Sequence, residues 1–179
     1  MFTDSHTHLY LKDFNDDLDI VIDNAKLQKV NKFLLPNIDI NSLPNLIGLH
    51  KKNPKLFYPM IGLHPCSVSN HFYDELEKIY KYITHHPFIG VGEIGIDLYW
   101  DQTYIAEQKE AFKIQIGWSK IHDLPIVIHC RNSFNEIYDI LSAEKSENTK
   151  GIFHCFSGNY KEAIKIIEMG FYLGIGGII

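Results

Sequence analysis

The chain has 179 residues, of which 45% are hydrophobic and 22% charged, and its formal net charge is −5. This length and composition are typical of one globular domain, and no apolar run approaches the roughly 20 residues that span a bilayer. The negative charge argues against a broad surface that coats nucleic acid, but it leaves room for a small local phosphate site.

Short β-rich runs alternate with longer amphipathic segments along the whole chain. The predicted strands are Phe2–Leu9, Lys32–Asn37, Leu56–Leu63, Phe88–Ile94, Ile126–Cys130, Gly151–Phe156 and Phe171–Ile175. The predicted helices between them are Phe14–Lys29, Ser42–Lys52, Tyr73–Thr84, Thr103–His122, Ser133–Ala143 and Lys161–Glu168. Such alternation predicts a parallel sheet with right-handed crossovers, and a repeat of roughly 25 to 30 residues fits a TIM-like (β/α) barrel. We therefore expect an α/β fold in a single domain over residues 1–179.

Several predicted strands are followed by a histidine or a carboxylate, and in such barrels the chemistry lies at the carboxyl ends of the strands. The residues at these ends are His6, His8, His64, Glu93, His129 and His154. Gathering so many polar groups away from water would be costly without a ligand, so the pattern predicts a metal centre. Imidazole and carboxylate ligands without a thiolate suit zinc, manganese or magnesium, and Glu93 is suited to bridge two ions.

Five segments together resemble the TatD family of metal-dependent deoxyribonucleases, within the amidohydrolase superfamily. They are Asp4–Leu9, Gly62–Pro65, Gly92–Asp97, Ile128–Arg131 and His154–Gly158, in this order and spacing. The resemblance implies a TIM-like barrel, two divalent metal ions and hydrolysis of DNA phosphodiesters, typically from an end. It also implies that His6 and His8 bind one metal, that Glu93 bridges, and that His129 and His154 bind the second.

The chain departs from that family at its end. The family closes its barrel with an eighth strand whose final aspartate binds metal, whereas seven strands are counted here. Either the barrel is truncated after the seventh strand or the missing strand comes from elsewhere. The segment from Gly170 to Ile179 would then form an open edge through which the chain self-associates. We expect weak or absent nuclease activity and unequal metal occupancy for residues 1–179, with activity restored by a further strand that ends in aspartate.

The predicted function is two-metal hydrolysis of DNA, with Glu93 as the catalytic carboxylate and single-stranded DNA or 3′ ends as substrate. His64 and Arg131 are predicted to contact phosphate, although a turn histidine and a solvated arginine are the alternatives. Tyr99 and Trp100 either stack on a terminal base or lie buried under a loop.

Two other functions stay open from the sequence. A small-molecule hydrolase of the same superfamily, acting on an amide, lactone or phosphotriester, would use nearly the same ligands. The chain could also be a metal-binding protein without catalytic activity, because the aspartate that ends the family's eighth strand is absent. His6 and His8 stand where a signal peptide would lie, and the three scattered cysteines suggest no disulfide framework, so we expect a cytoplasmic protein without membrane contact.

Overall fold

The computed structural model of the protein describes residues 1–177, and within them seven strands alternate with helices. The strands are β1 (Phe2–Asp4), β2 (Val30–Leu35), β3 (Phe57–Pro59), β4 (Val91–Asp97), β5 (Ile126–Arg131), β6 (Gly151–Phe153) and β7 (Tyr172–Leu173). The helices are α1 (Leu18–Leu27), α2 (Leu43–Lys52), α3 (Phe72–Tyr80), α4 (Ile105–His122), α5 (Phe134–Glu144) and α6 (Tyr160–Glu168), with short 3₁₀ turns at Lys12–Phe14 and Pro65–Ser67. All strand pairs are parallel, which confirms the predicted α/β class.

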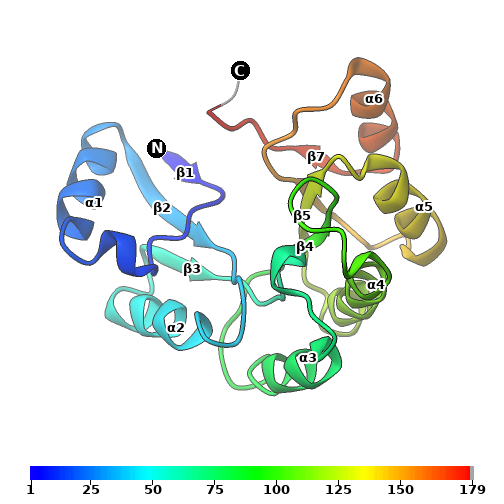
Figure 1. Ribbon diagram of the computed structural model, residues 1–179. Helices are drawn as coiled ribbons and strands as arrows, with labels where there is room; N and C mark the ends of the chain where they lie inside the picture. Colours follow the sequence, from blue (N-terminus) through cyan, green and yellow to red (C-terminus); the bar gives the residue numbers. More distant parts are fainter. Residues whose placement is uncertain (178–179) are drawn as a thin grey trace.

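The strands form two sheets that curve around a common interior (Figure 1). One sheet has the order β1-β2-β3 and the other the order β4-β5-β6-β7, so each strand lies beside its neighbour in sequence. An isolated bridge between Ile61 and Val91 helps to join the sheets, and the helices lie on the outside of the curve. This arrangement is a partial barrel whose carboxyl strand ends face the same side.

Asn37 ties the two sheets together just beyond β2. Its backbone N–H donates to the carbonyl oxygen of Gly92 at 2.9 Å, and its own carbonyl oxygen accepts from the N–H of Glu93 at 3.1 Å. The side-chain amide donates to the carbonyl oxygen of Gly62 at 2.7 Å. Asn37 is fully buried, so these bonds satisfy groups that water cannot reach and fix the backbone of Glu93 relative to the first sheet.

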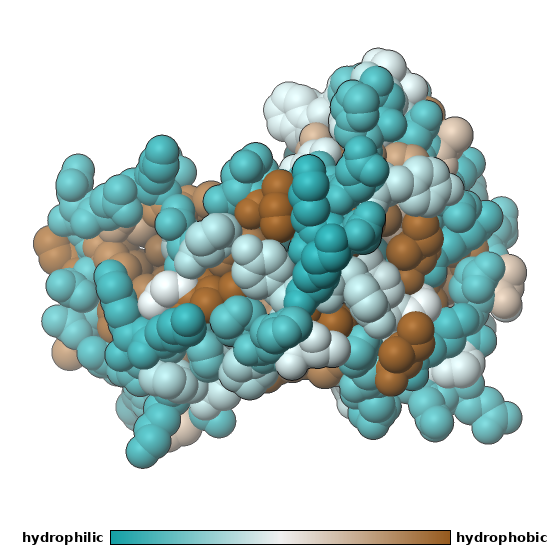
Figure 2. Space-filling model, turned by 90° about the horizontal axis from the view of Figure 1, so that it is seen from below, coloured by the Kyte–Doolittle hydropathy of each residue, from teal (hydrophilic) through white to brown (hydrophobic). Residues whose placement is uncertain are grey.

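A hydrophobic core lies between the sheets and the helices. Helix α4 presents Phe112 and Ile116 to β4, whose seven residues are all buried because both faces of this strand are covered. The face seen from below is mostly hydrophilic, with hydrophobic residues in small scattered groups (Figure 2). No helix in the described range is long and apolar enough to cross a membrane.

Several predicted strands are longer than the observed ones: the strand predicted over Leu56–Leu63 is paired only over Phe57–Pro59. We predicted a strand through Leu9, but β1 ends at Asp4, and Asp4 Oδ1 accepts a hydrogen bond from the backbone N–H of His6 at 3.1 Å. An aspartate that bonds to the backbone two residues on turns the chain, which is why the strand stops there. The last predicted strand is also shorter, because only Tyr172 and Leu173 pair with β6.

Within the described residues, β1 pairs only with β2, and β7 pairs only with β6. A cavity of about 270 Å³ lies near both ends, lined by Asp4, Ser5 and His6 on one side and by residues 174–177 on the other. Ile178 and Ile179, which we assigned to the open edge, lie outside the described residues. Self-association through this edge stays a prediction.

Candidate metal centre

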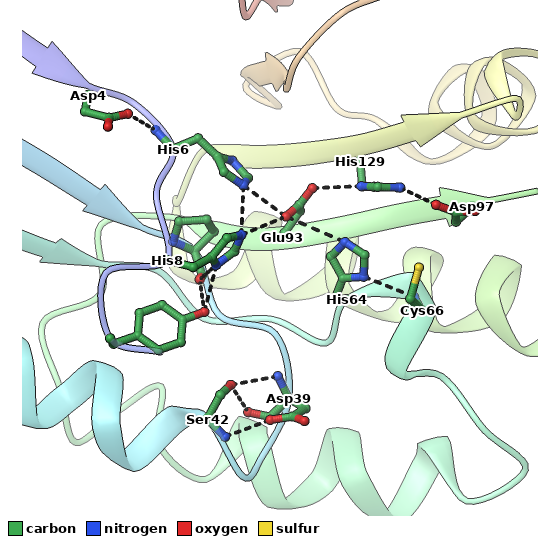
Figure 3. Close-up of polar contacts among 12 residues, drawn as sticks. Asp4, His6, His8, Asp39, Ser42, His64, Cys66, Glu93, Asp97 and His129 are labelled. Carbon is green, nitrogen blue, oxygen red and sulfur yellow. Dashed lines mark hydrogen bonds and ion pairs between the residues drawn. The ribbon is translucent and has the colours of Figure 1, made fainter. Parts of the chain in front are cut away.

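Glu93 lies at the centre of a cluster of imidazoles (Figure 3). The residue is 2% exposed, and its carboxylate faces the ring nitrogens of four histidines from different parts of the chain. The nitrogens of His6, His8 and His64 lie 3.0, 3.6 and 3.7 Å from Glu93 Oε2, and that of His129 lies 2.9 Å from Oε1. Burial alone would raise the pKa of Glu93, but His129 and His6 at hydrogen-bond distance, with His64 and His8 close by, hold that pKa well below its usual value. The carboxylate is therefore ionised at neutral pH.

His6, His8 and Glu93 form a triangle with the dimensions of a metal site. The Nε2 atoms of His6 and His8 are 3.2 Å apart, and they lie 3.0 and 3.6 Å from Glu93 Oε2. Ligands about 2.0–2.1 Å from a tetrahedral zinc ion would be about 3.3 Å apart, which matches these separations. The donor set and its spacing therefore fit a divalent transition metal.

Tyr10 sets the protonation of the His8 ring. The Tyr10 hydroxyl donates to the carbonyl oxygen of Pro36 at 2.6 Å, so its oxygen is free to accept from His8 Nδ1 at 2.9 Å. A proton on Nδ1 leaves a lone pair on Nε2, which faces the cluster. In His6, by contrast, Nδ1 is buried with no hydrogen-bond partner in the described part of the chain.

His129 lies between two carboxylates. Its Nδ1 is 2.9 Å from Glu93 Oε1, and its Nε2 is 2.8 Å from Asp97 Oδ2. Burial alone would lower the pKa of His129, but the hydrogen bonds and charges of Glu93 and Asp97 raise it above its usual value. Asp97 also keeps Nε2 as a donor, so Nδ1 is the nitrogen that can bind a metal once its proton leaves.

His64 also faces Glu93, but its ring proton lies on a different nitrogen from that of His8. Together with Glu93 and His129 it forms a second group of atoms close enough to share an ion. However, the backbone N–H of Cys66 donates to His64 Nδ1 at 3.1 Å, so the proton of the neutral ring is on Nε2. Because a metal needs a lone pair, this tautomer favours hydrogen-bond donation from His64 over ligation.

His154 lies in the same cavity but outside both groups. Its ring stacks on that of His6 with centroids 3.3 Å apart, and it lines a cavity of about 410 Å³ together with the other four histidines, Glu93 and Arg131. Burial and the neighbouring His6 lower the pKa of His154 to about 4, so its ring is neutral near pH 7. A neutral ring has the lone pair that ligation requires.

The structure brings all seven predicted site residues to one cavity: His6, His8, His64, Glu93, His129, Arg131 and His154. Asp97 was missed as a member of the site, although Glu93 and Asp97 stand four residues apart on one strand and therefore share a face. The spacing of these two carboxylates is visible in the sequence, but the predicted strand ended at Ile94 and so left Asp97 outside it. Tyr99 and Trp100 are 52% and 68% exposed, so the expectation that they lie buried under a loop is wrong.

A profile of the family described as TatD related DNase matches residues 3–179. The uncharacterized metal-dependent hydrolase YabD from Bacillus subtilis is 33% identical over 177 residues, which make up 99% of this chain and 69% of YabD. The chain therefore aligns from end to end with about two thirds of that relative.

Solved structures agree with this result. The crystal structure of YjjV, a TatD homolog from Escherichia coli K12, superposes with a TM-score of 0.90 at 26% identity, covering 98% of this chain and 68% of that one. A hydrolase TatD family protein from Entamoeba histolytica has the same fold, with a TM-score of 0.79 at 20% identity over 97% of this chain and 64% of its own.

Proposed function

The chain belongs to the TatD related DNase family and is a metal-dependent hydrolase of that family, and we propose that its substrate is DNA. The match to the TatD related DNase family supports DNA as the substrate, and the observation that carries the metal-dependent chemistry is the buried, ionised Glu93 with imidazole nitrogens on both of its oxygens. A carboxylate so placed is suited to bridge two cations. We further propose a single domain over residues 1–179 that hydrolyses phosphodiester bonds from a single-stranded end.

The proposed ligands are His6 and His8 for one ion and His129 and His154 for the other, with Glu93 shared between them. Divalent ions held there would neutralise charge on the scissile phosphate and lower the pKa of a bound water towards neutrality. Of the predicted ions, zinc suits the imidazoles best, whereas manganese and magnesium suit the carboxylate.

The remaining residues of the cavity would act on the phosphate itself. His64 carries its proton on Nε2, so it is suited to donate a hydrogen bond to a phosphate oxygen that enters the cavity. Arg131 adds a permanent positive charge with donors in a planar fork, which matches two phosphate oxygens at once. Positioning by these two groups would supply the local phosphate site that a chain of net charge −5 needs.

The test is hydrolysis of a 5′-labelled single-stranded oligonucleotide by the purified chain with Mg²⁺, Mn²⁺, Zn²⁺ or a chelator. We expect weak, metal-dependent shortening from an end, and no cleavage of a circular single strand. Two results would contradict the proposal. Turnover of amides, lactones or phosphotriesters without DNA cleavage would favour a small-molecule hydrolase. Metal binding by calorimetry without hydrolysis of any of these substrates would favour a silent metal-binding protein.

Asp97→Asn should weaken the metal affinity of the site containing His129 by about 10- to 100-fold, because partners that orient a ligating histidine have effects of this size. The amide removes the charge that holds His129 Nε2 as a donor at 2.8 Å. Titration calorimetry with Mn²⁺ measures the affinity, and Asp101→Asn, an exposed carboxylate in the following loop, is the matched control. Equal affinities in the Asp97→Asn and unmodified proteins would show that Asp97 does not orient this ligand.

A further inference from the structure

An aromatic and cationic cluster made of Tyr99, Trp100 and Arg131 lies beside the cavity. The Arg131 guanidinium carbon is 4.0 Å from the ring centre of Tyr99 and 5.2 Å from that of Trp100. The two aromatic rings meet edge to face with centroids 4.9 Å apart. We call these three residues the aromatic platform. Trp100 is 68% exposed, so most of its indole surface faces solvent.

The platform is held in place by the same carboxylate that contacts the candidate metal centre. Asp97 Oδ1 accepts hydrogen bonds from the backbone N–H groups of Tyr99 at 2.8 Å and Trp100 at 3.0 Å, while Oδ2 faces His129. The N–H of Leu98 donates to the carbonyl oxygen of Arg131 at 2.9 Å, and Asp97 and Arg131 are paired across β4 and β5. The loop that presents an exposed tryptophan is therefore anchored on both sides.

Arg131 connects the platform to the cavity. It lines the cavity with Glu93 and the histidines, and it contacts both aromatic rings. Consider a ligand that has a phosphate in the cavity and a flat group attached close to that phosphate. Its phosphate would contact the guanidinium of Arg131, and its flat group would lie on the indole face of Trp100. A nucleotide has this combination, and aromatic faces bind bases with little sequence preference because every base has a π-face.

We propose that the aromatic platform binds a nucleobase of the substrate strand next to the scissile phosphate, with Trp100 as the main stacking surface and Tyr99 and Arg131 as its support. This inference rests on the proposed function, since it names how that site would recognise a single strand. It assigns to Trp100 a role in substrate binding. Preference for unpaired ends follows, because a base must leave its duplex stack before it can lie on the indole.

The first test compares a substrate with bases to one without. For Trp100→Ala, we expect the ratio of kcat/KM on a thymidine oligonucleotide to kcat/KM on bis(p-nitrophenyl) phosphate to fall by about 5- to 100-fold. Trp100→Phe should restore most of the ratio, because the ring face is kept. Ile121→Ala is the matched control: Ile121 is 71% exposed and lies in the last turn of α4, and its removal should leave the ratio unchanged. An unchanged ratio in Trp100→Ala would overturn the proposal.

The second test measures binding without turnover. The chain has two tryptophans, and Trp118 is only 6% exposed, so Trp118→Phe leaves Trp100 as the sole tryptophan signal. With Mg²⁺ present, a phosphorothioate thymidine oligonucleotide should quench this fluorescence saturably, and an abasic strand of equal length should quench it much less. Equal quenching by both strands would overturn base stacking. If the unmodified chain cleaves no DNA, the proposed function fails, while the quenching still decides whether the platform binds bases.

Discussion

Glu93→Gln should lower hydrolysis of DNA by at least about 10²- to 10³-fold, the range seen when one preorganised electrostatic group is removed from an active site. Glutamine keeps the volume of the side chain but loses the charge that holds two cations near each other. Because Glu93 faces four imidazoles, the same change should reduce the number of metal ions bound per chain. Turnover of a labelled oligonucleotide and metal content after dialysis measure the two effects.

Glu110→Gln is the matched control for this substitution, because Glu110 is a half-buried carboxylate on α4 that forms an ion pair with Lys113. It should change neither turnover nor metal content. Circular dichroism of the Glu93→Gln protein separates loss of the site from loss of the fold. If the Glu93→Gln protein is folded and its turnover at saturating metal is unchanged, Glu93 has no part in the mechanism.

Gly95→Ala should destabilise the protein by about 3 kcal/mol or more, because it combines backbone strain with a clash in a buried strand. Gly95 has φ of 144°, a conformation that side chains rarely adopt, and a Cβ added there would overlap the carbonyl oxygen of His129. Gly95 is also the register partner of His129 across β4 and β5. Relief of the clash would therefore move a proposed metal ligand, and activity should fall together with stability.

The matched control is Gly117→Ala, within α4, where an added Cβ meets nothing within 4 Å. Removing a glycine from a helix interior should stabilise the protein by about 0.5–1 kcal/mol. Urea denaturation measures both variants. If Gly95→Ala unfolds at the same urea concentration as the unmodified protein, the strand contact between Gly95 and His129 is not as close as the structure has it.

The order and type of the elements could be predicted from the sequence, because parallel strands buried on both faces appear as apolar runs and the helices between them as amphipathic segments. The ends of the strands could not. β1 stops at Asp4 because of a side-chain bond to the backbone of His6, and β4 extends past Ile94 to Asp97. The first depends on a local side-chain bond and the second on pairing with β5, and an apolar pattern encodes neither. The division into two sheets also follows from tertiary contacts that periodicity does not reveal.

The gathering of histidines around Glu93 could be predicted, because the carboxyl ends of parallel strands meet on one side. Which nitrogen of each ring faces the carboxylate could not be predicted, because it depends on partners such as Tyr10 for His8 and the backbone N–H of Cys66 for His64. Spacing along the chain also does not show which of His64 and His154 binds metal and which contacts the substrate. The structure places His64 nearer to the carboxylate, and its tautomer still argues for hydrogen bonding to substrate.

Because the fold is divided into two sheets, metal binding is linked to relative motion of these sheets. His6 and His8 follow β1 in the first sheet, whereas Glu93 and His129 belong to the second. In the described residues the backbone bonds between these two halves are confined to Asn37, residues 59–61 and residues 89–93. An ion held by both sets of ligands would hold the two sheets together at the place where they join, which we call the seam. Binding would then stabilise the closed arrangement against any hinge motion that separates the halves, by about 2.7 kcal/mol when the free ion is at a hundred times its dissociation constant. Local opening at the seam and the free concentration of the ion would become one coupled equilibrium.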